Sequence, residues 1–82
     1  MNIYIVLSSV TFAMQSKDAL ELNDITCRVR QAPRQIAHRG CAYSVIINKN
    51  DMKIALDIIK THDFKLLGVY ESLGDDMYEP IL

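Results

Sequence analysis

Apolar residues repeat with two different periods along this 82-residue chain, and the order of these segments limits the folds open to it. The segments with a period of two, which is typical of strands, are 2–7, 25–30, 41–47 and 65–70. The segments with helical spacing of apolar residues are 10–22 and 52–61. The predicted order is therefore strand, helix, strand, strand, helix, strand.

This order predicts an α+β domain. Two right-handed β-α-β crossovers joined by a hairpin give the ferredoxin-like β-α-β-β-α-β sandwich. We expect an antiparallel sheet with strands in the order 4-1-3-2 and both helices on one face. Residues 1–72 would form this single domain, and residues 73–82 would form an acidic C-terminal tail.

Alternation within each predicted strand assigns side chains to the two faces of the sheet. The predicted helix-facing residues are Ile3, Ile5, Leu7, Ile25, Cys27, Val29, Ala42, Ser44 and Ile46. The predicted residues of the other, open face are Tyr4, Val6, Arg28, Arg30, Cys41, Tyr43, Val45 and Ile47. An apolar surface of this size usually marks an interface. We therefore expect a homodimer or another partner to cover the open face, unless the tail folds across it.

Composition narrows the class of protein. Half of the residues are hydrophobic, which is enough for one core, and two cysteines cannot build the disulfide framework of a small secreted domain. The apolar run after Met1 is too short for a signal peptide or a membrane span. We therefore expect a soluble protein of a reducing cytoplasm, with no membrane contact.

The stretch from Pro33 to Cys41 lies in a segment that is rich in arginine and contains no acidic residue. All four arginines lie within residues 28–39, and no acidic residue occurs between Asp24 and Asp51. A cysteine reacts as the thiolate, and neighbouring cations lower its pKa. Cys41 is therefore a candidate nucleophile or carrier thiol at the junction of a loop and a strand. The alternative is that it is an ordinary small residue at the start of a strand.

Other residues of this stretch are candidates to bind substrate or to activate the thiol. They are Pro33, Arg34, His38, Arg39 and Gly40. Cys27, in contrast, is predicted to be a core residue because it alternates with apolar neighbours. The sequence has no CxxC pair, no glycine-rich phosphate loop and no carboxylate pair at a catalytic spacing. We expect no bound metal and no separate cofactor.

The run from Pro33-Arg34 through Ile36 to Cys41, with the apolar strand after it, resembles the selenium/sulfur carrier-like family of small bacterial proteins. The helix that starts with serine, SSVTFAMQSKDALELND, and the strand after it follow the same layout, so the resemblance covers residues 3–47. It implies that Cys41 carries the chalcogen, as a covalent persulfide or its selenium analogue. It also implies a cysteine desulfurase-type donor as partner, and a carrier rather than a turnover enzyme.

Two other functions are open alternatives. Residues 39–44, RGCAYS, are similar at four of six positions to the third-strand signature of the RNA-recognition motif, which has the same order of elements. Tyr4 and Tyr43 would then stack on bases of a single strand. Cys41 stands at a stacking position and the tail is acidic, so we do not expect nucleic acid to be the partner. The second alternative is an interaction or dimerisation module without covalent chemistry.

Overall fold

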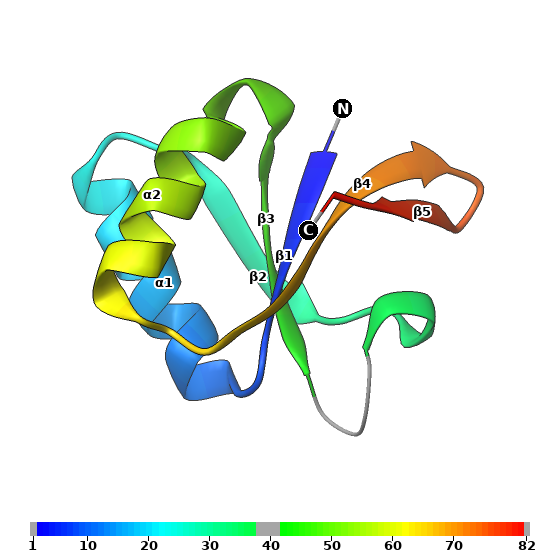
Figure 1. The fold of residues 1–82 in the computed structure, drawn as a ribbon, viewed down its shortest axis with the longest axis horizontal. Helices are drawn as coiled ribbons and strands as arrows, with labels where there is room; N and C mark the ends of the chain where they lie inside the picture. Colours follow the sequence, from blue (N-terminus) through cyan, green and yellow to red (C-terminus); the bar gives the residue numbers. More distant parts are fainter. Residues whose placement is uncertain (1, 38–41, 82) are drawn as a thin grey trace.

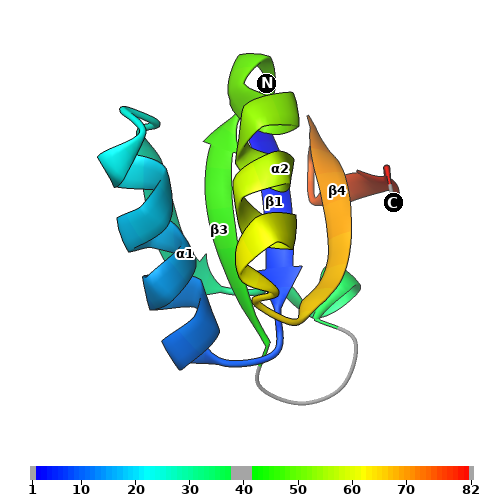
Figure 2. The same cartoon turned by 60° about the vertical axis from the view of Figure 1, so that its left-hand side comes forward.

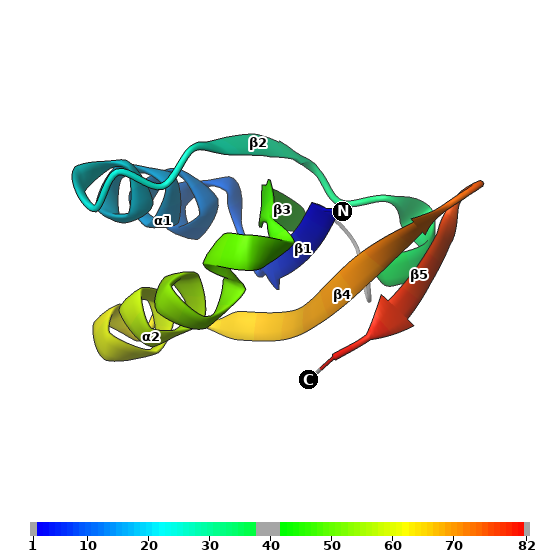
Figure 3. The same cartoon turned by 90° about the horizontal axis from the view of Figure 1, so that it is seen from above.

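A five-stranded antiparallel sheet with two helices on one face forms the α+β fold of this chain (Figures 1 and 3). The computed structural model describes residues 2–37 and 42–81. The strands are β1 (Asn2–Leu7), β2 (Cys27–Gln31), β3 (Tyr43–Asn48), β4 (Leu66–Gly74) and β5 (Met77–Pro80). The helices are α1 (Val10–Leu22) and α2 (Met52–His62), with short 3-10 turns η1 (Arg34–Ile36) and η2 (Lys49–Asp51).

The sheet has the strand order β2-β3-β1-β4-β5. Its first four members follow the predicted order 4-1-3-2 read from the opposite edge. The edge strand β5 corrects the four-stranded expectation, because it lies in the segment that we took for an acidic tail and pairs antiparallel with β4. It is only four residues long and ends in Pro80. Proline cannot donate to a ladder, so such a strand suits only the edge of a sheet.

Helix α1 begins and ends at polar residues that cap it, Ser9 and Asn23. The Ser9 hydroxyl accepts a hydrogen bond of 3.2 Å from the backbone N–H of Phe12, which satisfies one of the free donors of the first turn. The Asn23 side chain donates to a carbonyl one turn earlier, at 2.9 Å. The residues of α1 buried against the sheet are Ala13, Ser16 and Leu20. Neither helix in the described ranges is long and apolar enough to cross a membrane.

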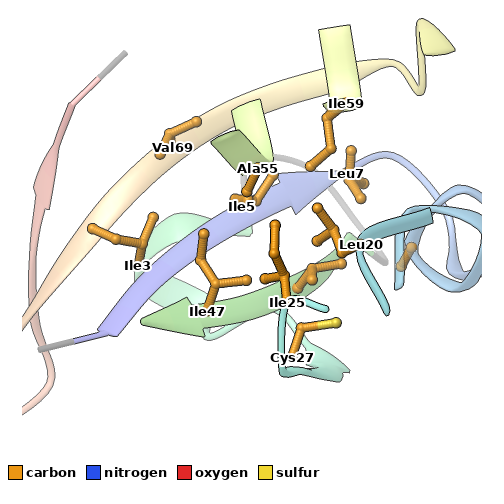
Figure 4. Packing of buried hydrophobic residues seen from close by; sticks show 12 residues of the cluster. Ile3, Ile5, Leu7, Leu20, Ile25, Cys27, Ile47, Ala55, Ile59 and Val69 are labelled. Carbon is orange, nitrogen blue, oxygen red and sulfur yellow. The ribbon is translucent and has the colours of Figure 1, made fainter. Parts of the chain in front are cut away.

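Helices α1 and α2 cover one face of the sheet (Figure 2), and the main hydrophobic core lies between them and the strands (Figure 4). Its twelve buried residues are Ile3, Ile5, Leu7, Ala13, Leu20, Ile25, Cys27, Val45, Ile47, Ala55, Ile59 and Val69. Burial of one large aliphatic side chain contributes about 1.5–3 kcal/mol. Strand β1 and its neighbours β3 and β4 supply half of these twelve residues. Burial of apolar side chains on this face of the sheet is therefore the main contribution to the stability of the fold.

The phase of β3 is opposite to our prediction. Val45 and Ile47 belong to the core beneath the helices, and they pair with Ile5 and Ile3 of β1. Paired residues of neighbouring strands share a face of the sheet. The residues that turn to the other face are Ala42, Ser44 and Ile46, and Tyr43 moves to the helix side. Both faces of this central strand are buried, so alternation alone cannot decide which set faces the helices.

A second, smaller cluster covers part of the opposite face of the sheet. Its buried residues are Val6, Ala32, Ile36 and Ala42. Half-buried residues that pack against them are Tyr4, Ala37, Tyr70 and Tyr78. Turn η1 and strand β5 supply members of this cluster, and both lie across the sheet from the helices (Figure 1). Residues of η1 and β5 therefore cover part of the open face of the sheet, for which we had expected a homodimer, another partner or the tail.

Candidate functional site

A cavity of about 360 Å³ opens on the face of the sheet away from the helices. Its lining residues are Tyr4, Arg30, Gln31, Pro33, Asp76 and Tyr78. They come from β1, from β2 and the residues after it, and from the β4–β5 hairpin. This size falls at the small end of the range for ligand-binding pockets, about 300–1,000 Å³.

Contacts between distant segments build the walls of this cavity. The backbone N–H of Ala32 donates to the carbonyl of Ala42 at 3.0 Å, which joins the end of β2 to the start of β3. The Gln35 side chain of η1 donates to the backbone carbonyl of Asp76 at 3.2 Å, which joins η1 to the hairpin. The rings of Tyr4 and Tyr78 meet edge to face, with centroids 5.2 Å apart. Three parts of the chain are thus held around one hollow.

The hairpin that brings Tyr78 and Asp76 to the cavity has an unusual backbone. Gly74 pairs with Met77, so the two residues between them form the loop. Both of these, Asp75 and Asp76, have positive φ, at 51° and 60°. A two-residue hairpin needs this conformation because it matches the right-handed twist of the strands. Aspartate adopts it more readily than most residues do.

The electrostatics of the cavity centre on the phenol of Tyr78. Burial raises the pKa of Tyr78, and the nearby Tyr4 phenol and Asp76 carboxylate act in the same direction, while Arg30 acts against them. The phenol therefore stays neutral and able to donate a hydrogen bond. The Arg30 and Asp76 side chains are exposed, and within the described ranges neither forms an ion pair. Within residues 2–37 and 42–81, the cavity thus presents a cation and a carboxylate that have no ion-pair partner.

The structure brings some of the predicted site residues together and separates others. Tyr4, Arg30 and Pro33 line the same cavity, while Arg34 is exposed at the start of η1. Arg28 lines a different hollow, of about 260 Å³, near the other end of β2. The predicted residues His38, Arg39, Gly40 and Cys41 lie outside the described part of the chain. Our argument that Cys41 points to the open face used the reversed phase of β3 and no longer supports that placement.

Tyr43 does not lie on the open face. It is half-buried and packs against the core beneath the helices, whereas Tyr4 packs on the other side of the sheet. The two tyrosines are therefore on opposite faces and do not form the shared stacking platform that the RNA-recognition motif requires. The prediction for Tyr43 was wrong because it followed from the wrong phase of β3.

Three cavity residues, Gln31, Asp76 and Tyr78, were missed by the sequence analysis. A turn signal was present, since Gly74-Asp75-Asp76 stands between the apolar residues Leu73 and Met77. The second strand of the hairpin is too short to show a period of its own. Its return to the sheet, and hence the position of Tyr78, depends on pairing with β4.

Cys27 is buried in the core, as predicted, with 7% of its surface exposed. Burial is the largest cause of the raised pKa of its thiol, and Glu21 adds to it. The Sγ atom lies 3.9 Å from the backbone carbonyl of Lys17 and is positioned to donate a weak hydrogen bond to it. Such a thiol contains little thiolate at neutral pH and reacts slowly. Over residues 2–37 and 42–81, no three His, Cys, Asp or Glu side chains are grouped to hold a metal ion.

Comparison with known proteins gives one match. The model of a family described as "Putative Se/S carrier protein-like" matches residues 2–71, which is most of the chain. Searches of curated proteins and of solved structures found no match. The matched range includes both cysteines and every strand except β5 and the last residues of β4. The chain therefore belongs to the selenium/sulfur carrier-like family.

Proposed function

We propose that this protein carries sulfur or selenium as a covalent adduct on Cys41. The observation that carries the proposal is the burial of Cys27 in a chain with two cysteines. A carrier of this family needs an accessible thiol, and the raised pKa of Cys27 makes it a poor nucleophile. Cys41 is the other cysteine, and it lies within the range that the family model matches.

The transfer step needs no external oxidant. The Cys41 thiolate attacks the outer, sulfane sulfur of a persulfide on a donor protein of the cysteine desulfurase type. A new S–S bond forms to Cys41 as the S–S bond of the donor breaks, and the electron pair of the broken bond leaves on the donor thiolate. The products are the Cys41 persulfide and the free donor thiol. A selenium donor would react in the same way and give the selenium analogue.

The sequence supplies the groups that would favour the thiolate. Arg34, His38 and Arg39 precede Cys41 within seven residues, and no acid occurs from residue 25 to residue 50. Cations near a cysteine lower its pKa and stabilise the anionic forms of its adducts. The Arg34 side chain is exposed and has no carboxylate partner within the described ranges. It is therefore available to such an anion.

The cavity supports a role for this face in the function. Ala42 directly follows Cys41 in the sequence and is hydrogen-bonded to Ala32, which precedes the cavity residue Pro33. Ala42 also packs in the cluster that contains Tyr4 and Tyr78. We infer that a group bound in the cavity is close to Ala42, the residue that follows Cys41 in the sequence. We further propose that the first four strands and both helices form a ferredoxin-like unit, with β5 as an addition, and that the protein works in the cytoplasm.

Intact-protein mass spectrometry tests the carrier function. The protein is incubated with a cysteine desulfurase and cysteine, and then analysed without reductant. We expect the wild type and Cys27→Ser to gain the mass of one sulfur atom, and Cys41→Ser to gain none. An adduct that survives Cys41→Ser and is lost in Cys27→Ser would show that Cys27 is the carrier. No adduct on any variant would favour a module without covalent chemistry.

A further inference from the structure

The cavity carries opposite charges that the fold does not pair with each other. Arg30 projects from β2 and Asp76 from the hairpin loop, and both line the hollow. Their atoms are not within ion-pair distance of one another or of any other described charge. Both nevertheless affect the pKa of the Tyr78 phenol: Asp76 raises it and Arg30 lowers it. The phenol therefore has a positive group and a negative group in its surroundings.

Each lining group has a natural partner in a small molecule. An arginine guanidinium binds a carboxylate with a planar pair of hydrogen bonds. An aspartate accepts from an ammonium group, and the tyrosine hydroxyls and the Gln31 amide can supply further hydrogen bonds. A ligand that carries one carboxylate and one ammonium group satisfies both charges at once. A simple anion would leave Asp76 beside it as a repulsive neighbour.

We propose that this cavity binds a free α-amino acid in its zwitterionic form, with Arg30 on the carboxylate and Asp76 on the ammonium group. The volume of about 360 Å³ admits a small amino acid. The proposal rests on the proposed carrier function for the nature of the side chain, which we take to be that of cysteine, its persulfide or the selenium analogue of that persulfide. The bond from Ala32 to Ala42 places this cavity beside the residue that follows Cys41. Bound cysteine persulfide would give its outer sulfur to the Cys41 thiolate, with the cysteine thiolate as the leaving group. In the reverse direction, the thiolate of bound cysteine would take the outer sulfur of the Cys41 persulfide and release the Cys41 thiolate.

A binding experiment without sulfur transfer tests this site. The probe is S-methyl-L-cysteine, which has both charged groups and no free thiol, added to the Cys41→Ser variant and followed by calorimetry or NMR titration. We expect binding of the probe. We expect weaker binding, by about tenfold or more, of the analogue without the amino group and of the analogue without the carboxylate, because each loses one charge-assisted interaction. If the analogue without the amino group binds as well as the probe, the cavity is an anion site and the zwitterion proposal is wrong.

Two matched pairs of variants locate the binding. Arg30→Gln should weaken binding of the probe by about tenfold or more, whereas Arg28→Gln, on the same strand but outside the cavity, should leave it unchanged. Asp76→Asn should likewise weaken binding, whereas Asp75→Asn in the same turn should not. Asparagine tolerates positive φ, so the turn is kept in both. The proposal would be overturned if the two variants of either pair weakened binding of the probe equally. It would also be overturned if none of the four variants and the parent protein bound the probe.

The outcome is independent of the carrier chemistry. Persulfide formation on Cys41 without binding of the probe would leave the carrier function in place and remove the amino-acid site. Binding of the probe without persulfide formation on Cys41 would leave the amino-acid site in place and remove the carrier function. The two proposals therefore fail separately.

Discussion

The two faces of the sheet are built on different principles. The cluster on the helix face contains twelve buried residues, nearly all aliphatic, and is closed by α1 and α2 (Figure 4). The cluster on the opposite face contains four buried residues, of which two are alanines, and around it lie tyrosines and a polar cavity. A closed aliphatic core supplies stability, whereas a polar hollow of this size is suited to binding a small molecule. The comparison shows a densely packed aliphatic face on one side of the sheet and a face with a polar cavity on the other.

The largest expected effect is the loss of stability when a buried isoleucine on each face of the sheet is replaced by alanine. Ile59 of the helix core and Ile36 of the smaller cluster are 1% and 3% exposed. Ile59→Ala should lower the free energy of unfolding by about 2–5 kcal/mol, because the dense core cannot close the space left behind. Ile36→Ala should cost less, since η1 is short and its neighbours can relax. Urea denaturation measures both variants, and equal costs would contradict a difference in packing between the faces.

A smaller effect is expected at the hairpin that forms one wall of the cavity. Gly74 has φ +86°, and nothing lies within 4 Å of the position that a Cβ atom would occupy. Gly74→Ala should therefore lower stability through backbone strain alone, by about 1 kcal/mol. Gly74→Asn is the matched control, because asparagine accepts positive φ more readily, and it should cost less. Thermal unfolding of the two variants gives the answer; identical melting temperatures for Ala and Asn would speak against a strained backbone.

The smallest expected effect is the pH dependence that Cys27 gives to the helix face. Burial raises the pKa of its thiol in the folded chain, so the neutral form is favoured there. This contribution to stability is complete below the ordinary thiol pKa and is lost as the pH rises through the folded-state value. The free energy of unfolding should therefore fall more steeply in the wild type than in Cys27→Ala above a pH of about 8.5. Parallel profiles for the two proteins would show that the thiol is not shielded in the folded state.

Much of the fold follows from patterns that are local in the sequence. The two helices and the position of Cys27 in the core were all predicted from spacing and residue type. The order of the first four strands followed from the handedness of the crossovers. These features depend on interactions between residues close in sequence or on rules of chain connection.

The candidate site was less accessible to prediction. Sequence placed Tyr4, Arg30 and Pro33 among the site residues, and the structure gathers these three at one cavity. It did not indicate Asp76 or Tyr78, which reach the cavity only through a hairpin that folds back along β4. Arg28 and Arg30 are two residues apart on one strand and still line different hollows.

By itself, the sequence determined the two helices and the first four strands, their order, the burial of Cys27 and the basic stretch before Cys41. Only the tertiary structure decided the phase of β3, the presence of β5 and the composition of the cavity. The physical reason is the same in each case. Some strands are apolar on both sides or too short to show a period. For such a strand, pairing with the neighbouring strands decides which side chains face the helices and where the strand lies in the sheet. Those neighbours lie far away along the chain, where local patterns carry no information about them.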